Sequence, residues 1–538
     1  MINPIAQRWD FSFGDLPNSF EKASKWKKAK GTIFSPEIRS AQNQMKQLRK
    51  ILNADQIRKA DQHTIDQEPI SSIALMERAA ESCVRAIETS NLAKKKILVV
   101  CGIGNNGGDG LAITRLLSGK GHSVTAILVK FKKSLSPDCD ANLKRLDNVA
   151  LYENGCPLPD LSAFDLIIDA IFGSGLTRPP EGFVAELILA INESGKEICS
   201  IDLPSGLNCD NIANSIYIVK ADRVISFQRP KMCFFYPENG LYIKSWEVEN
   251  IGLDEGFIQK QNSDHYILDH EISRLVKDRE RYSHKGNYGH TLLIAGEYGK
   301  MGAAVLAARA CIKSGTGLLT TYVPKCGYEI MQRTVPEAMC LTDSNNETLS
   351  ETPDTTKYSS IGIGPGIGTK HETAVMLGNL LRECQKPIVL DADALNILSE
   401  NKKLIELIPK NSVLTPHIKE FDRLTGKSKN SIERFEKQAN FSRTHRCIVV
   451  LKDAHTCISS TDGKLYFNTS GNPGMATGGS GDVLTGIVAG LLAQQYEPLT
   501  AALIAVYYHG LAGDKSAKLN GMNALTASDL VDQLSIEN

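Results

Sequence analysis

Short apolar runs alternate with helical patterns along most of this chain. Apolar residues recur at spacings of three and four over 54–67 and 72–88, which predicts two helices. Strand-like runs follow at 96–101, 123–129, 165–169 and 196–202. Helices are expected between them, from Leu111, near 138–146 and from Glu181. Such alternation predicts a mostly parallel sheet covered by helices.

A second series of the same kind follows a weaker stretch at about 230–265, which suits a closing strand and a linker. Its expected strands are 290–296, 318–323, 360–364, 387–391, 412–416 and 447–452. The 538 residues are too many for one ordinary core. We therefore predict an α/β protein with a poorly ordered extension at 1–48, a first domain at 49–262 and a second at 263–538.

Composition narrows the classes of function. Lys+Arg and Asp+Glu both number 61, and no long basic tract suggests nucleic acid or an anionic membrane as partner. The longest mostly apolar run is too short to span a bilayer, and the first twenty residues lack the apolar core of a secretory signal. The thirteen cysteines are scattered and never form CxxC, which fits reduced thiols. We predict a cytoplasmic protein.

The most informative motif is GNPGMATGGSGDVLTG at 471–486, where five glycines precede Asp482 and an apolar helical stretch follows. A glycine-rich turn that opens a helix presents free backbone N–H groups, which favour phosphate. Phosphate would repel an acid in that turn unless the acid took a proton from a hydroxyl being phosphorylated. The alternative is a tight turn with a surface acid.

Three weaker features accompany this turn in the second half. They are the glycine loop 362–368, His417 with Glu420 after a strand, and Lys452 at the end of an apolar strand. A helix cap is the alternative for His417 and Glu420. Together with Asp482 they predict a nucleotide phosphate at the glycine turn and a second substrate facing the acid.

The first half has a glycine loop of its own, GIGNNGGDG at 102–110, between a strand and a helix. It satisfies the dinucleotide fingerprint G-x-G-x-x-G. The second strand, however, ends in Val129-Lys130, where a dehydrogenase has an acid for the ribose. A dehydrogenase is therefore disfavoured. The polar side chains of Asn105, Asn106 and Asp109 indicate additional contacts with a ligand.

Two carboxylates follow strands of the same half: Asp169, and Asp202 with Ser205 close behind it. Because the carboxyl ends of parallel strands share one edge, both acids and the glycine loop are expected around one crevice. Each Asp alone could instead cap a helix or turn. Lys130 supplies an ammonium partner, unless it is simply a solvated lysine of the run 130–133.

On these motifs the chain resembles the bifunctional NAD(P)H-hydrate repair enzymes, which fuse an epimerase domain to an ADP-dependent dehydratase domain. The resemblance runs from about residue 50 onward through GIGNNGGDGL, DAIFGSGL, IDLPSGL, HKGNYGH, GPGIG, TPH and GNPGMATGGSGDVLTG. It implies a Rossmann-like three-layer domain followed by a ribokinase-like α/β domain. It also implies epimerisation of the R and S hydrates, and dehydration of the S form with ADP to give NAD(P)H, AMP and phosphate.

For the epimerase the resemblance implies Asp169 as catalytic acid or base and potassium held by Asn106, Asp169 and Ser205. The implied substrate contacts are Asn105, Asn106, Gly107, Gly108, Asp109, Gly173, Ser174, Gly175, Leu176, Thr177, Arg178, Pro179 and Asp202. Lys130 is taken as the catalytic lysine. Lys132 is the alternative, since VKFKKSL departs from the family pattern.

For the dehydratase the resemblance implies Asp482 as proton acceptor and Mg²⁺ with ADP. The implied hydrate contacts are Ala303, Gly366, His417 and Asp482. The implied nucleotide contacts are Lys452, Asp453, Ala454, His455, Thr456 and Gly481. Asp453 replaces the commoner glycine of this loop, so the choice between ADP and ATP stays open.

Two other readings remain. A small-molecule kinase of the same superfamily, with an appended regulatory domain, would release its phosphorylated product; Thr415-Pro416-His417, where vitamin kinases have TPN, favours the dehydratase. The first half could instead be a catalytically silent binding or oligomerisation module. The polar residues expected around its crevice argue against this: Asp169, Asp202, Asn105 and Asn106. We expect NAD(P)H hydrate and ADP as small-molecule partners, and a homo-oligomer.

Overall fold

The first domain is built on a seven-stranded sheet in which every neighbouring pair is parallel, in the order β3-β2-β1-β4-β5-β6-β7. The computed structural model describes residues 48–89, 92 and 95–537, so the predicted extension lies outside the described residues except for Leu48. The strands are β1 (Lys96–Cys101), β2 (Ser123–Val129), β3 (Val149–Tyr152), β4 (Leu166–Ala170), β5 (Glu197–Ile201), β6 (Arg223–Phe227) and β7 (Trp246–Glu249).

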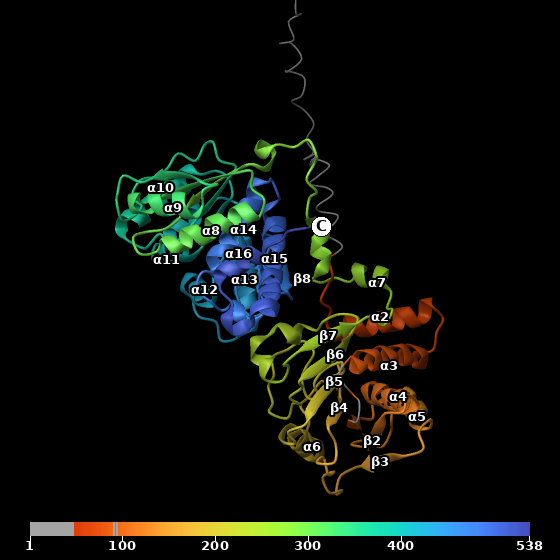
Figure 1. Cartoon of the computed structure of the whole chain (residues 1–538). Helices are drawn as coiled ribbons and strands as arrows, with labels where there is room; N and C mark the ends of the chain where they lie inside the picture. The colour runs from red at the N-terminus through yellow and green to blue at the C-terminus, as the bar shows by residue number, and fades with distance from the viewer. Residues whose placement is uncertain (1–47, 90–91, 93–94, 538) are drawn as a thin grey trace, which may run out of the picture.

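Helices lie on both faces of this sheet, with α3, α4 and α5 on one side and α6 on the other (Figure 1). They are α2 (Ala54–Gln67), α3 (Ser72–Glu88), α4 (Asn105–Gly119), α5 (Pro137–Leu143) and α6 (Gly182–Glu193), with α7 (Glu255–Lys260) near the second domain. The helix α2 starts at a capping box formed by Asn53 and Gln56. The three-layer α/β arrangement confirms the predicted fold class.

The helix after the first glycine loop starts earlier than predicted. We expected it from Leu111, but α4 begins at Asn105, so the glycines form its first turn. A Cβ added at Gly107 would lie 1.8 Å from the backbone oxygen of Gly102, so only glycine fits this turn. The prediction was wrong because a glycine-rich sequence is typical of a loop and carries no apolar period that marks a helix.

The second domain contains a ten-stranded sheet in the order β11-β10-β9-β12-β13-β14-β15-β16-β17-β8. Its strands are β8 (His265–Leu268), β9 (His290–Ile294), β10 (Leu318–Val323), β11 (Met339–Thr342), β12 (Ser360–Ile363), β13 (Ile388–Leu390), β14 (Val413–Leu414), β15 (Ile448–Leu451), β16 (Cys457–Ser459) and β17 (Leu465–Asn468). All neighbouring pairs are parallel except those of β16 with β15 and β17. Four of these strands, β8, β11, β16 and β17, were not predicted.

The helices of this domain are α8 (Met301–Lys313), α9 (Tyr328–Thr334), α10 (His371–Glu383), α11 (Ala392–Glu400), α12 (Ile418–Thr425), α13 (Ser431–His445), α14 (Ser480–Ala493), α15 (Pro498–Asn520) and α16 (Ala527–Gln533). The first turn of α14 carries the acid of the glycine turn. This helix packs closely on α8: a Cβ added at Gly486 would lie 2.1 Å from the backbone oxygen of Ala307. Small residues therefore fix the position of α14.

Replacing Gly486 with alanine tests this packing. We expect Gly486→Ala to lower the free energy of unfolding by about 1–3 kcal/mol, because the added methyl group forces α14 and α8 apart. Urea unfolding followed by circular dichroism measures the change. Gly302→Ala on α8 is the matched control, since no atom lies within 4 Å of the added Cβ. It should stabilise the protein by about 0.5–1 kcal/mol through helix propensity. Equal effects of the two substitutions would contradict the close-packing explanation.

The two domains share packed contacts. Phe235, which follows β6, lies 5.0 Å from Phe467 of β17 and 5.2 Å from His455, measured between ring centroids. Residues 49–51 pair with β8, as the Ile51 N–H donates to the His265 carbonyl and the Ile267 N–H to the Arg49 carbonyl. We propose a division near 262 and 263, although the first described residues pack on the second domain.

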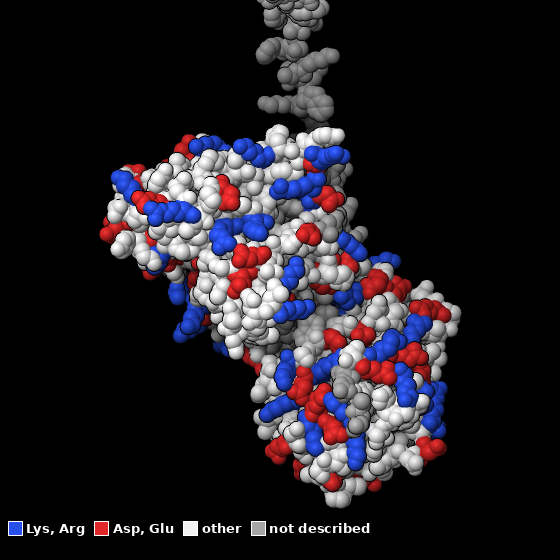
Figure 2. Space-filling model, viewed as in Figure 1, with Lys and Arg blue, Asp and Glu red and all other residues white. Residues whose placement is uncertain are grey.

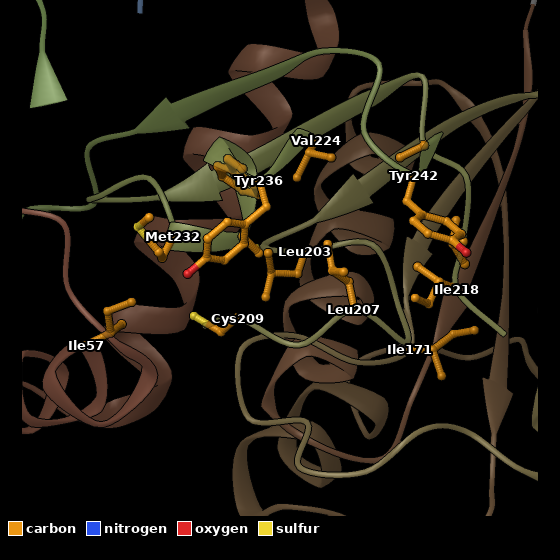
Figure 3. Packing of buried hydrophobic residues seen from close by; sticks show 14 of the residues in the cluster. Ile57, Ile171, Leu203, Leu207, Cys209, Ile218, Val224, Met232, Tyr236 and Tyr242 are labelled. Carbon is orange, nitrogen blue, oxygen red and sulfur yellow. The ribbon is translucent and has the colours of Figure 1, made fainter. Parts of the chain in front are cut away.

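The core of the first domain continues into this contact. Figure 3 shows Met232, Cys209 and Tyr236 gathered around one point, with Ile57 of α2 beside them. The same cluster includes Phe435 and Phe467 of the second domain. An apolar core that crosses the boundary holds the domains together.

The visible surface of both domains carries Lys, Arg, Asp and Glu side chains of mixed sign (Figure 2). Among the described residues, no helix combines the length and the apolar character needed to cross a membrane. All thirteen cysteines are free thiols.

Candidate functional site

A cavity of about 1000 Å³ lies between α2, α3 and the carboxyl ends of the strands in the first domain. Of the predicted residues, it is lined by Asn105, Asn106, Asp109, Lys132, Gly173, Ser174, Gly175, Leu176, Thr177, Arg178, Pro179 and Asp202. The residues predicted from two distant motifs and one strand end therefore meet in a single pocket. Gly107, Gly108, Lys130, Asp169 and Ser205 are not among its lining residues.

Asn106 marks the part of this pocket that is prepared for a ligand. The residue is 9% exposed, and both atoms of its side-chain amide lack a hydrogen-bond partner among the described residues. A Cβ added at Gly173 would lie 3.3 Å from the Asn106 Oδ1 and 2.8 Å from the Asp202 Oδ2. Glycine thus leaves both polar groups accessible. A buried amide without partners indicates a group that binds there.

Asp169 lies behind the cavity lining, at the end of β4. Its fully buried carboxylate accepts hydrogen bonds from the Ser205 N–H (2.8 Å), the Ser205 hydroxyl (2.5 Å) and the Ser200 hydroxyl (2.8 Å). Burial raises the pKa of Asp169, and these hydrogen bonds oppose the rise. Two of the three predicted potassium ligands are therefore in direct contact.

Lys231 is the lysine that sequence reasoning missed. It is fully buried and lines the cavity, with Nζ 3.2 Å from the Asp202 Oδ1. Lys130 directly follows β2, and its backbone N–H donates to the Tyr152 carbonyl. The available signal is a lysine directly before the apolar run Met232–Phe235, in a stretch whose pattern predicts a closing strand and a linker.

Asp202 has a strained backbone conformation and a charged carboxylate. Its φ of 65° is in the left-handed region, which is rare for residues other than glycine and is found at functional sites. Burial disfavours its charged form, but Lys231 and the N–H of Ser174 outweigh this and lower its pKa. Asp202 is therefore an ionised acid held in a fixed orientation.

The second site surrounds Asp482, in the first turn of α14. Burial, and after it the charge of Asp391, raises the pKa of Asp482 to about 7 against the opposing effect of Lys452. A general base needs a pKa near the working pH, and the Asp482 carboxyl has one.

Asp391 was also missed, although it follows a strand that was predicted. It is 1% exposed, and its carboxylate accepts hydrogen bonds from Lys452 Nζ (2.9 Å) and from the Thr485 hydroxyl (2.6 Å). Ala392 directly after it has a φ of 47°. The strand-end rule that singled out Asp169 and Asp202 would have found Asp391 as well. This acid fixes Lys452 beside the glycine turn.

The remaining predicted hydrate contacts lie on α8, on a glycine loop and at the start of α12. Gly366, with a φ of 62°, approaches Ala303 of α8 so closely that an added Cβ would lie 3.2 Å from the Ala303 Cβ. His417 caps α12 in a capping box with Glu420, so the cap proposed as an alternative is present. Its backbone also bridges to Lys452. Burial, followed by Lys452, lowers the pKa of His417.

The predicted nucleotide loop, which begins at Lys452, forms a turn near Asp482. Asp453 and Ala454 are exposed, and the Ala454 N–H donates to the Asp453 Oδ1 (2.8 Å). His455 Nδ1 contacts the Asn468 carbonyl at 3.1 Å. A Cβ added at Gly481 would lie 3.1 Å from Lys452 Nζ, so the lysine reaches the glycine turn. The ammonium, free helix N–H groups and Asp482 thus converge, as a phosphate-binding site requires.

Both domains match families of known proteins. Residues 72–233 match the family model described as YjeF-related protein N-terminus, and residues 291–535 match the model described as NAD(P)H-hydrate dehydratase. The bifunctional NAD(P)H-hydrate repair enzyme Nnr of Moorella thermoacetica is 34% identical over 90% of this chain and 96% of its own length. The corresponding enzyme of Coxiella burnetii is 35% identical over 89% and 98%.

Among solved structures, the ADP/ATP-dependent NAD(P)H-hydrate dehydratase of Bacillus subtilis, co-crystallised with ATP and Mg²⁺, is 30% identical. It covers 49% of this chain and 94% of its own, with a TM-score of 0.43. The two full-length relatives span both domains, as this chain does. The chain therefore belongs to the bifunctional NAD(P)H-hydrate repair enzymes.

Proposed function

We propose that Asp482 is the base that starts dehydration of the S hydrate, with ADP bound between Lys452 and the glycine turn. The supporting observation is the Asp391–Lys452 pair beside Asp482 at the N-terminus of α14. Asp482 takes the proton of the ring hydroxyl as that oxygen attacks the terminal phosphorus of ADP, and AMP leaves. Phosphate then departs from the ring together with a ring proton, which restores NAD(P)H.

Lys452 and the α14 N-terminus stabilise the charge that spreads over the transferred phosphoryl oxygens. Asp391 orients Lys452 but does not face the substrate in this scheme. The exposed loop at Asp453 and Ala454 lies where the nucleotide base or ribose would bind. Mg²⁺ would neutralise the nucleotide phosphates. No group of three or more His, Cys, Asp or Glu side chains in the described part is arranged to hold a metal ion.

The raised pKa of Asp482 predicts a pH dependence. A base acts in its ionised form, and the pKa of this carboxyl is about 7. We expect kcat/KM for dehydration to rise with pH through about 7, and to fall about tenfold for each pH unit below it. Initial rates of NAD(P)H formation at saturating ADP between pH 5.5 and 8.5 measure this. A flat profile would contradict the role of Asp482 as base.

For the first domain we propose epimerisation of the hydrates in the cavity beside Asn106, with Lys231 and Asp202 as charged groups that contact the ring. Potassium fits the oxygens of Asn106, Asp169 and Ser205, because weakly charged oxygen sets suit a monovalent cation and the Asn106 Oδ1 has no partner. When bound, this ion would hold a phosphate or hydroxyl oxygen of the substrate. Lys130 and Lys132 stay predictions for the catalytic lysine, but burial against Asp202 favours Lys231.

Both proposals are tested by supplying each hydrate epimer with ADP, ATP or no nucleotide and separating the products by chromatography. The S form should disappear quickly with nucleotide, and the R form should follow at the rate of epimerisation. Without nucleotide the epimers should interconvert and no NAD(P)H should form. Release of a stable phosphorylated hydrate would favour the small-molecule kinase instead.

A further inference from the structure

An acid on the wall opposite the strand ends also lines the epimerase cavity. Asp61 lies on α2, and it lines the cavity together with Ile57 and Ile65 of the same helix. It lies ahead of residues 72–233, which match the family model. Asp202 and Lys231 reach the cavity from the other side, after β5 and β6. The cavity therefore brings an acid of α2 together with the Asp202–Lys231 pair.

The surroundings of Asp61 leave its carboxyl free to react. No hydrogen bond from a described residue contributes to its ionisation, which is governed by burial and by nearby charge. Burial outweighs the opposing charge of Lys231 and, together with the charge of Asp202, raises the pKa of Asp61 to about 7. Asp109 of α4 is the other acid facing this group. Arg58 of α2 also lines the cavity, and it forms an ion pair with Asp55.

We propose that Asp61 is the general acid–base catalyst of epimerisation, acting on the hydroxyl of the hydrated ring from the side opposite Asp202. The proposal rests on the epimerase function of the first domain. The carbon that bears this hydroxyl also carries the ring nitrogen, so loss of the hydroxyl is assisted by the nitrogen lone pair. A proton donor at the hydroxyl is the group that this chemistry needs.

The step balances without any co-reactant other than water. Asp61 gives its proton to the hydroxyl, the carbon–oxygen bond breaks, and the nitrogen lone pair forms a carbon–nitrogen double bond. Water leaves. A second water adds to the opposite side of the ring, the electron pair returns to nitrogen, and Asp202 accepts the proton that this water releases. Exchange with solvent then returns the proton from Asp202 to Asp61, and the reverse reaction uses the two acids in exchanged roles.

The test compares Asp61→Asn, Asp61→Glu and Asp66→Asn, in the full-length protein. Asp66 is the matched control, because it lies on the same helix but is exposed. We expect Asp61→Asn to lower kcat of epimerisation by about 10²–10⁴-fold relative to the wild type, after the uncatalysed rate is subtracted. KM should change little. Asp61→Glu should restore part of the rate, and Asp66→Asn should match the wild type. Dehydration of pure S hydrate with ADP should be the same in all four proteins.

The pH profile separates a catalytic role from a structural one. The active enzyme carries one proton on the Asp61–Asp202 pair, and Asp61 holds it at the start of the reaction. Because Asp61 loses this proton above about pH 7, the wild-type rates of R-to-S and of S-to-R conversion should both decline there. In Asp61→Asn this decline should vanish. Wild-type rates in Asp61→Asn, or an equal loss of both activities, would overturn the proposal. A wild-type protein that dehydrates the S hydrate but never interconverts the epimers would instead refute the epimerase function itself.

Discussion

Replacing Asp482 with asparagine should abolish ADP-dependent dehydration while leaving epimerisation intact. We expect kcat for dehydration to fall by about 10²–10⁴-fold, because an amide cannot accept the hydroxyl proton. Folding should be little affected. The carboxyl already has a pKa of about 7, raised by burial and by Asp391, so a neutral group suits its surroundings.

The measurement is the formation of NAD(P)H from S hydrate and ADP, together with calorimetric binding of ADP. Nucleotide affinity should remain close to that of the wild type, since Lys452 and the glycine turn are unchanged. Asp532→Asn is a suitable control because this exposed acid pairs with Arg309 at the surface. If Asp482→Asn dehydrated the hydrate at the wild-type rate, the base would have to be another residue.

Replacing Lys231 with methionine should have the second large effect, confined to epimerisation. We expect a loss of about 10²–10⁴-fold in kcat/KM for epimerisation, since the cavity loses the cation that holds Asp202 in place. The substitution also leaves a buried carboxylate unpaired, which costs about 3–5 kcal/mol of stability. Lys231→Met combined with Asp202→Asn removes that charge and should recover the stability but not the activity.

Chromatography of the two epimers without nucleotide gives the rates, and thermal unfolding gives the stability. Lys130→Met and Lys132→Met, measured in parallel, test the lysines that sequence analysis favoured. An inactive Lys130→Met beside an active Lys231→Met would support Lys130 as the catalytic lysine and contradict our assignment.

The chain pattern predicted the long, regular elements well. The strands β1, β2 and β10 and the helices α2 and α3 have the predicted bounds, because buried parallel strands and amphipathic helices leave continuous or periodic apolar patterns. The short strands at the sheet edges were missed. The strand β11, for example, has exposed and half-exposed positions throughout, so no apolar run marks it.

The site residues, like the strands and helices, fall into a group that the sequence predicted and a group that it did not. Asp482, Asp202 and Asn106 were predicted because each stands in a glycine loop or at a strand end, where the sequence itself limits the possible roles. Lys231 and Asp61 lie in no such motif. They line one cavity only because α2 and the segment after β6 fold against each other there.

By itself, the sequence determined the alternation of strands and helices, the two glycine turns and the family, since local pattern and motif spacing are properties of neighbouring residues. The tertiary structure alone decided which lysine meets Asp202 and that Asp61 faces the same cavity. It also decided that Asp391 holds Lys452 and that one apolar core crosses the domain boundary. These contacts join residues far apart along the chain, and burial sets their charges, so neither can be deduced from local sequence.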